Sequence, residues 1–198
     1  MTEDDPLDEI SQIEAQIEEL AEVAGRCRRF VLASQAAIAG GFGLLLVGDG
    51  RGGFRAVDVA QSGVQIFGEQ RGAAVSDYDR DGRTDLVIAQ NGGATQLFRN
   101  SSAKPGLRVR LEGGDANPDA VGASVRLRFG ERTGPRRELH AGSGYWSQDS
   151  AVAVLGMPEP PTEVWVRWPG GQETKSVVPA GAAEVVIKSG GQIEAVSR

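Results

Sequence analysis

Residues 77–88 read Asp-Tyr-Asp-Arg-Asp-Gly-Arg-Thr-Asp-Leu-Val-Ile, a dense group of carboxylates followed by the start of an apolar strand. The aspartates occupy positions 1, 3, 5 and 9 of the loop: Asp77, Asp79, Asp81 and Asp85. Gly82, at position 6, permits a sharp turn in which alternate side chains converge on one point. Carboxylates brought that close repel one another unless a cation lies among them. The spacing therefore predicts a metal site in a tight loop.

The oxygen-rich character of this loop favours Ca²⁺ over Mg²⁺. Calcium takes about six to eight oxygens, so the backbone carbonyl of Arg83, at position 7, and water can complete the shell. Magnesium prefers fewer protein ligands in rigid octahedral geometry. The loop is not an EF-hand, because position 12 is Ile88 and residues 86–89 predict a strand. We expect a strand–loop–strand calcium site, with a solvated acidic turn as the alternative.

The sequence on both sides of the loop, from residue 49 onward, predicts β-structure. Short apolar runs alternate with turns, and glycine is common, at 28 residues. The expected strands are residues 54–59, 64–67, 86–89, 95–98, 107–111, 123–129, 151–155, 164–168 and 184–188. Asn91-Gly92-Gly93 predicts a hairpin turn. Alternation within 107–111 places Arg108 and Arg110 on the wet face, as in a small antiparallel β-sandwich.

The first 29 residues predict an amphipathic helix. Their apolar residues recur at intervals of 3 and 4 and form one stripe: Ile10, Ile13, Ile17, Leu20 and Ala24. The stripe suits either a short coiled coil, through which the chain could form an oligomer, or an ordinary amphipathic helix.

Residues 30–48 contain no charged side chain and are just long enough for a transmembrane signal-anchor helix. Arginines at 26, 28 and 29 would hold the N-terminus in the cytoplasm, leaving the β region outside. The alternative is a buried core helix or strand, since Leu44–Val47 alone suits a strand. Secretion is the alternative to membrane anchoring.

The loop and its following strand, residues 77–88, resemble the calcium-binding FG-GAP or VCBS repeat of integrin-like β-propellers. The Gly-rich stretch Gly48-Asp49-Gly50-Arg51-Gly52-Gly53-Phe54 and the lead-in over residues 68–75 agree with that pattern. The resemblance implies that the four aspartates of the loop ligate calcium. Residues 47–100 cover about one propeller-like blade, and a closed propeller needs several.

Residues 106–190 resemble the ASPIC/UnbV domain in three ordered blocks. These are Asn117-Pro118-Asp119-Ala120-Val121-Gly122-Ala123, Gly142-Ser143-Gly144-Tyr145-Trp146-Ser147-Gln148 and Val166-Arg167-Trp168-Pro169-Gly170-Gly171. One departure is Leu155-Gly156-Met157, where the family shows a longer Gly-Leu-Gly pattern. The resemblance implies a surface or secreted protein without a defined catalytic activity.

Aromatic residues in these blocks have two interpretations. Tyr145, Trp146 and Trp168, with Gln148 nearby, either pack in the core or form a platform for a sugar or protein ligand. Both alternatives stay open on the sequence.

Composition argues against other function classes. The net charge of −6 is unsuited to nucleic acid, and one histidine and one cysteine cannot build a zinc site. The expected segments are an amphipathic helix (1–29), a signal-anchor (30–48), an FG-GAP/VCBS-like repeat (49–103) and an ASPIC/UnbV-like β domain (104–198). We expect a non-enzymatic, calcium-binding adhesion or recognition module, with a protein or carbohydrate ligand at the cell surface. The alternatives are an oligomeric membrane-anchored scaffold and a carbohydrate-active enzyme.

Overall fold

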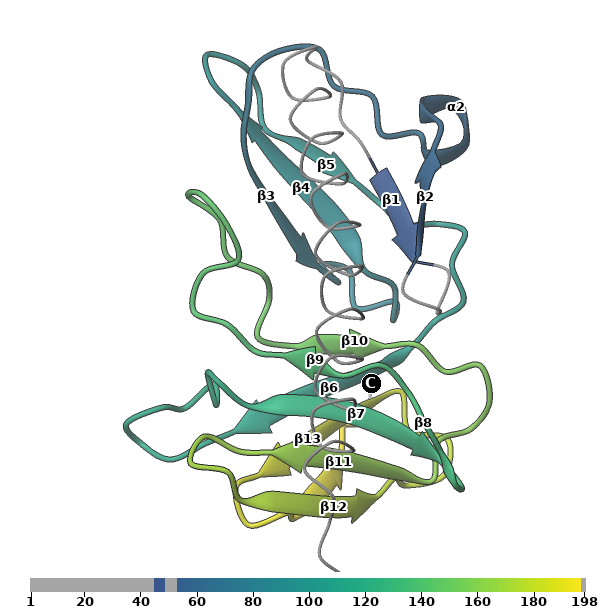
Figure 1. Cartoon of the computed structure of the whole chain (residues 1–198), viewed down its shortest axis with the longest axis vertical. Helices are drawn as coiled ribbons and strands as arrows, with labels where there is room; N and C mark the ends of the chain where they lie inside the picture. The colour runs from purple at the N-terminus through teal and green to yellow at the C-terminus, as the bar shows by residue number, and fades with distance from the viewer. Residues whose placement is uncertain (1–44, 49–52, 197–198) are drawn as a thin grey trace, which may run out of the picture. The chain divides into compact units, whose positions relative to one another are not determined.

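The computed structural model describes residues 45–48 and 53–196, and the chain divides into two units, residues 1–68 and 69–198 (Figure 1). In the first unit, strands β1 (Leu45–Gly48) and β2 (Phe54–Val57) form an antiparallel pair. A one-turn helix, α2 (Val59–Ser62), follows, and the Asp58 side chain caps it by accepting a hydrogen bond from the amide of Ala60. Residues 64–67, expected as a strand, have no regular secondary structure.

Strand β1 overturns the predicted transmembrane helix over residues 30–48. Its four residues are the last four of that segment, and they are extended and paired with β2, with Leu45 opposite Val57. A short apolar run that ends at a glycine suits a hairpin strand better than the last turn of a membrane helix. In the part of the chain that the structure describes, no helix has the length and apolar character to cross a membrane. Residues 30–44, like the amphipathic helix predicted over 1–29, lie outside the described residues.

The second unit begins with a three-stranded antiparallel sheet of β3 (Gln70–Ser76), β4 (Asp85–Gln90) and β5 (Gln96–Phe98). Ser76 pairs with Asp85, so the aspartate loop is the connection between β3 and β4. The predicted turn at residues 91–93 joins β4 to β5, with Gly92 at φ 67°. This position needs the left-handed conformation that glycine adopts without strain.

Two further sheets form a β-sandwich over the rest of the unit. One sheet has the order β10-β6-β13-β14, and the other has the order β12-β11-β7-β8 with β9 also paired to β7. The bounds of these strands are β6 (Leu107–Glu112), β7 (Ser124–Phe129), β8 (Arg132–Thr133), β9 (Arg137–Glu138), β10 (Ala153–Leu155), β11 (Glu163–Arg167), β12 (Glu173–Val177), β13 (Glu184–Lys188) and β14 (Ile193–Ala195).

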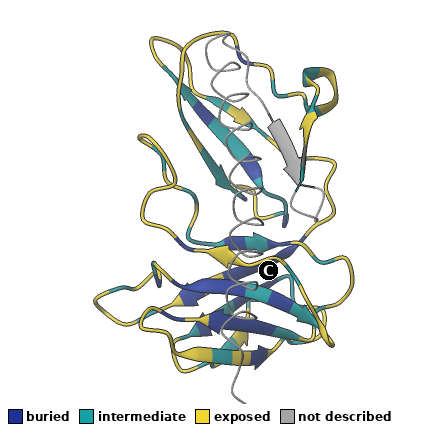
Figure 2. Ribbon diagram, viewed as in Figure 1, coloured by how far each residue is buried: buried dark blue, intermediate teal, exposed yellow. Residues whose placement is uncertain are grey.

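Apolar residues from both sheets of the sandwich share one core (Figure 2). Leu107, Val109 and Leu111 face it from β6, and Val125 and Leu127 face it from β7. The period-2 pattern read from the sequence therefore marks the buried face of these strands correctly. The mainly β fold is confirmed.

The sequence predicted a wholly antiparallel sandwich, but one pair of strands in it is parallel. Strand β13 pairs with β6 in parallel, while the other paired strands run antiparallel. Strand β12 precedes β13 in sequence but belongs to the opposite sheet, so the chain crosses between sheets before β13 joins β6. This parallel register places Glu184 opposite Arg108, which matters for the site below.

Candidate functional site

The aspartate loop owes its shape to two residues in the left-handed region, Arg80 at φ 61° and Gly82 at φ 85°. A Cβ atom at Gly82 would lie 3.1 Å from both Pro105 Cβ and the carbonyl oxygen of Gly106. The amide of Gly106 also donates a 2.7 Å hydrogen bond to the Gly82 carbonyl. Position 82 therefore requires glycine for its backbone angle and for the close approach of the chain leading into β6.

Three of the four aspartates converge. Asp77, Asp79 and Asp85 each offer one carboxylate oxygen, and these oxygens lie within 4.8 Å of one another. Calcium binds oxygens at about 2.3–2.6 Å, so two of its ligands are separated by at most about 5 Å. The spacing of these oxygens therefore fits a metal ion that is bound through carboxylates.

Backbone amides hold the two buried carboxylates in place. Asp77 Oδ1 accepts from the amide of Asp81 at 3.0 Å, and its Oδ2 accepts from the amide of Gly82 at 2.8 Å. Asp85 accepts from the amides of Tyr78 at 3.2 Å and Asn100 at 2.7 Å. Asp85 therefore joins the start of the loop to the segment that follows β5, a role that the sequence spacing did not reveal.

Asp81, the fourth predicted ligand, lies outside the converging group. Its carboxylate accepts hydrogen bonds from the Arg83 amide at 2.9 Å, from Arg83 Nη1 at 2.8 Å and from Arg99 Nη2 at 3.2 Å. Desolvation opposes ionisation of Asp81, but the hydrogen bonds and charge of Arg83, with the charge of Arg99, hold its pKa below the ordinary value. The Arg83 side chain also donates to the Ala103 carbonyl, and a role for the Arg83 carbonyl as a metal ligand stays a prediction.

Guanidinium groups lie among the carboxylates, an arrangement that the sequence pattern did not predict. Arg99 Nε lies 2.7 Å from Asp79 Oδ2, and the charge of Asp79 raises the pKa of Arg99. Arg108 Nη1 lies 2.5 Å from Asp77 Oδ2, and Arg108 Nε lies 2.8 Å from Glu184 Oε2. These cations offset part of the repulsion that the four aspartates would otherwise suffer.

Arg108 and Glu184 form a buried pair with shifted ionisation. Burial of Arg108 lowers its pKa, but hydrogen bonds to Asp77 and Glu184 outweigh that effect and raise it. Burial of Glu184 raises its pKa, but hydrogen bonds from Arg80 and Arg108 outweigh that effect and lower it. Both shifts favour the charged forms of Arg108 and Glu184.

The structure separates the four residues predicted to bind a ligand. Trp168 is 5% exposed in the sandwich core, where its Nε1 donates to Thr174 Oγ1 at 2.9 Å. Tyr145 and Trp146 are 68% and 86% exposed, with ring centroids 6.1 Å apart. Gln148 lines a cavity instead. Core packing therefore accounts for Trp168, and only Tyr145 and Trp146 present their rings to solvent.

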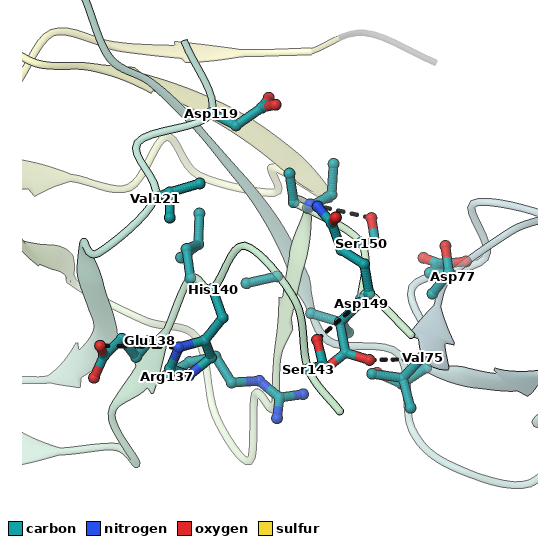
Figure 3. Close-up of a pocket in the computed structure, with 18 of the residues that line it drawn as sticks. Val75, Asp77, Asp119, Val121, Arg137, Glu138, His140, Ser143, Asp149 and Ser150 are labelled. Atoms are coloured by element: carbon teal, nitrogen blue, oxygen red, sulfur yellow. Dashed lines mark hydrogen bonds and ion pairs between the residues drawn. The ribbon is translucent and has the colours of Figure 1, made fainter. Parts of the chain in front are cut away.

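This cavity has a volume of about 460 Å³ and a mixed polar and apolar lining (Figure 3). In this view, Glu138 and His140 lie on one side, and Val75, Asp77 and Asp149 lie on the other. The histidine side chain is half exposed and lies 3.9 Å from the Glu138 carboxylate.

Comparison with known proteins identifies one part of the chain. No curated protein matches it. A family model described as "ASPIC and UnbV" matches residues 113–194, a range that includes strands β7 to β13, most of β14 and all three sequence blocks quoted above. The match does not extend to residues 49–103, so the FG-GAP/VCBS resemblance there stays an expectation. Residues 113–194 are thus similar to the ASPIC and UnbV family, in agreement with the resemblance of the three sequence blocks.

Proposed function

We propose that this chain is a non-catalytic recognition module that binds calcium through Asp77, Asp79 and Asp85. The observation that carries the proposal is the convergence of three carboxylate oxygens within 4.8 Å of one another. Two of the three side chains are buried and fixed by backbone amides, so little ordering remains to be done when an ion binds. Water and the Arg83 carbonyl would supply further oxygens.

Calcium would act here as a structural link. Asp77 follows the end of β3 and Asp85 begins β4, so one ion held by both would tie the two strands together at the loop. Asp77 is also bound to Arg108 in β6, which connects the loop to the sandwich. An ion that binds only the folded arrangement stabilises the fold by mass action.

We propose that the protein is secreted and acts outside the cell, where calcium is abundant. Extracellular modules bind calcium at about 10⁻⁴–10⁻³ M, and such affinities suffice where calcium is near the millimolar range. The recognition role draws support from two large aromatic side chains, Tyr145 and Trp146, that point into solvent.

We also propose that the chain is not an enzyme, and the support for this comes from the contacts of its single histidine, His140. His140 lies beside Glu138, and within the described residues no hydrogen bond joins it to Ser143. The Ser143 hydroxyl instead accepts a hydrogen bond from the Asp149 amide at 2.8 Å. This arrangement lacks the contact between a serine nucleophile and a histidine base that a hydrolase of the Ser–His type uses.

Isothermal titration tests the calcium site directly. Calcium is titrated into the wild type, into Asp79→Asn and into a control, Asp115→Asn, which removes an exposed carboxylate outside the loop. We expect one site in the wild type and in the control, and at least about tenfold weaker binding in Asp79→Asn because a charged ligand is lost. Equal heats for the wild type and Asp79→Asn would remove the site. A parallel titration with magnesium checks the choice of ion.

A further inference from the structure

Residues 142–149 form a tight turn with an aromatic tip, here named the aromatic hairpin. The amide of Ser143 donates a 3.0 Å hydrogen bond to the Ser147 carbonyl and closes the turn. Tyr145 and Trp146 lie between these two positions, at the tip. The hairpin is therefore closed by its own backbone, without help from the two rings.

Strand β3 holds this hairpin in place. Asp149 Oδ1 accepts from the amide of Val75 at 2.8 Å, and the amide of Ser150 donates to the Val75 carbonyl at 2.9 Å. A Cβ atom at Gly72 would lie only 3.0 Å from the Tyr145 carbonyl oxygen. The hairpin backbone is therefore packed directly against β3.

The rings at the tip are placed in a way that packing does not explain. Trp146 is 86% exposed and has φ 52°, a backbone conformation that is unfavourable for a bulky residue. By contrast, Trp165 and Trp168 are buried. Tyr145 lies beside Trp146 with an angle of 56° between the ring planes. A strained backbone and an exposed ring at the same residue favour a role in binding over a role in the core.

The base of the aromatic hairpin lines the cavity of about 460 Å³, a size within the range of small-ligand sites. Ser143, Gln148 and Asp149 are the hairpin residues of the lining. Tyr145 follows Ser143 by two positions, and Trp146 precedes Gln148 by two, a span of at most about 7 Å along the backbone. The exposed rings therefore lie close to the cavity.

Charged groups of both signs line this cavity. The carboxylates belong to Asp77, Asp119, Glu138 and Asp149, and the guanidiniums belong to Arg136 and Arg137. The side chain of Asp77 is 1% exposed and is paired with buried Arg108, so its charge is compensated within the protein. Three carboxylates and two guanidiniums remain, and the lining is close to charge balance with a small negative excess. An anion would meet the carboxylates and a cation would meet the arginines, so neither is well matched.

Donors and acceptors without a partner occur together in the same lining. Among the described residues, no hydrogen bond or ion pair engages the side chains of Asp119, Arg136, Arg137 and Gln148. An ionised carboxylate only accepts hydrogen bonds, a guanidinium only donates them, and an amide does both. A hydroxyl group also donates and accepts, so a ligand with several hydroxyls can use all these groups, whereas an anion can use only the donors.

We propose that the aromatic tip and this cavity together bind a neutral oligosaccharide. Aromatic faces stack on the C–H faces of sugar rings, and the polar groups of the lining bond the sugar hydroxyls. A chain of several sugar units can occupy the cavity and the tip at once. This inference rests on the proposed recognition role and names the class of ligand.

Tryptophan fluorescence of the full chain tests the class of ligand, because Trp146 is the one exposed tryptophan of the three. Two pairs of sugar tetramers are titrated at fixed calcium: galactose against galacturonic acid, and N-acetylglucosamine against glucosamine. Iodide quenching reports the accessibility of the ring. At least one neutral tetramer should protect Trp146 and bind at least about fivefold more tightly than its charged counterpart, because the charged sugar meets like charges in the lining.

Isothermal titration tests the site with variants, including the one that lacks the fluorophore. Trp146→Ala should bind the neutral tetramer about tenfold more weakly because stacking area is lost, and Gln148→Ala about fivefold more weakly because hydrogen bonds are lost. The controls are Val177→Ala and Gln172→Ala, at exposed positions outside the hairpin and the cavity, and they should leave the affinity unchanged.

The outcomes separate the class of ligand from the site. A charged tetramer that binds as tightly as its neutral counterpart, or more tightly, would overturn the neutral class. Binding unaffected by Trp146→Ala, or no binding of either neutral tetramer by the folded protein, would overturn the site. Calcium titration of the same samples distinguishes this proposal from the calcium site, since either site can fail while the other binds.

Discussion

The guanidinium of Arg108 lies 2.5 Å from Asp77 Oδ2 and joins the aspartate loop to strand β6 of the sandwich. Arg108 is only 5% exposed, and its Nε binds Glu184 on the neighbouring strand β13. One buried cation therefore holds two buried acids that lie 107 positions apart in the sequence numbering, at 77 and 184. The loop and the sandwich share this ion pair, so the stability of one depends on the other.

Replacing Arg108 tests this dependence. Arg108→Met keeps much of the side-chain volume but leaves Asp77 and Glu184 without their buried partner, and we expect the free energy of unfolding to fall by about 3 kcal/mol or more. Urea denaturation in the presence of a calcium chelator measures the change. The control is Arg110→Met on the same strand, at an exposed position, which should change stability by less than about 0.5 kcal/mol. Similar stabilities for the two variants would contradict a supporting role for the buried pair.

Arg99 competes with calcium for Asp79 in the proposed site. Its Nε lies 2.7 Å from Asp79 Oδ2, and its side chain is about half exposed, so the fold does not depend on it. Arg99→Gln should therefore tighten calcium binding severalfold, because a neighbouring positive charge is removed. Isothermal titration measures the affinity, and Arg71→Gln, at an exposed ion pair with Glu69, is the control. Weaker binding in Arg99→Gln would show that Arg99 supports the loop instead of opposing the ion.

In the absence of metal, replacing Asp85 should lower the free energy of unfolding more than replacing Asp79. Asp85 accepts hydrogen bonds from the amides of Tyr78 and Asn100 in a buried position, and Asp85→Ala leaves both donors without their acceptor. We expect a loss of about 2 kcal/mol or more in a calcium chelator. Asp79→Asn, at an exposed position, should cost less than about 1 kcal/mol under the same conditions. Thermal or urea unfolding with chelator distinguishes them, and equal losses would contradict a structural role specific to Asp85.

The folded protein should lose stability in acid because Glu184 becomes protonated. Its pKa is lowered from the ordinary value of 4.5 in the folded state, so the unfolded chain binds more protons as the pH drops through that value. The contribution is fully present above the unfolded pKa and is lost as the pH falls through the lower, folded pKa. Urea unfolding from about pH 7 to about pH 3 should show this acid limb in the wild type.

The variant Glu184→Gln checks the assignment. It should be less stable than the wild type at neutral pH and should lose less stability between about pH 5 and about pH 3, because the titrating group is gone. A control at the exposed Glu131, Glu131→Gln, should keep the wild-type slope. An unchanged slope in Glu184→Gln would assign the acid limb to other carboxylates.

Local sequence pattern predicted much of the loop and of the strands. Asp77, Asp79 and Asp85 converge as their spacing indicated, and Gly82 has the positive φ that a sharp turn demands. These features depend on backbone angles within a few residues, which sequence order specifies directly. The strand–loop–strand expectation required a strand before the loop, but the residues of β3 were not predicted, because the run Gln-Arg-Gly-Ala-Ala-Val-Ser has little apolar alternation and pairing with β4 decides its structure.

Contacts between segments that are distant in the sequence decided which arginine and tryptophan side chains are buried. Period-2 alternation placed Arg108 on the wet face of β6 with Arg110, yet the aspartate loop covers Arg108 and leaves Arg110 exposed. Likewise, Trp146 and Trp168 both occur in glycine-containing blocks, but one points into solvent and the other into the sandwich core. The residues next to each tryptophan in the sequence do not predict that Trp146 is exposed and Trp168 is buried.

The sequence by itself determined the aspartate spacing, the turn glycine, the alternating core strands and the ASPIC/UnbV blocks, because each of these is a property of neighbouring residues. Tertiary structure alone decided which charges became buried partners and which aromatic rings stayed in water. Burial is a property of what packs over a residue, and the segments that cover Arg108 and Trp168 come from elsewhere in the chain.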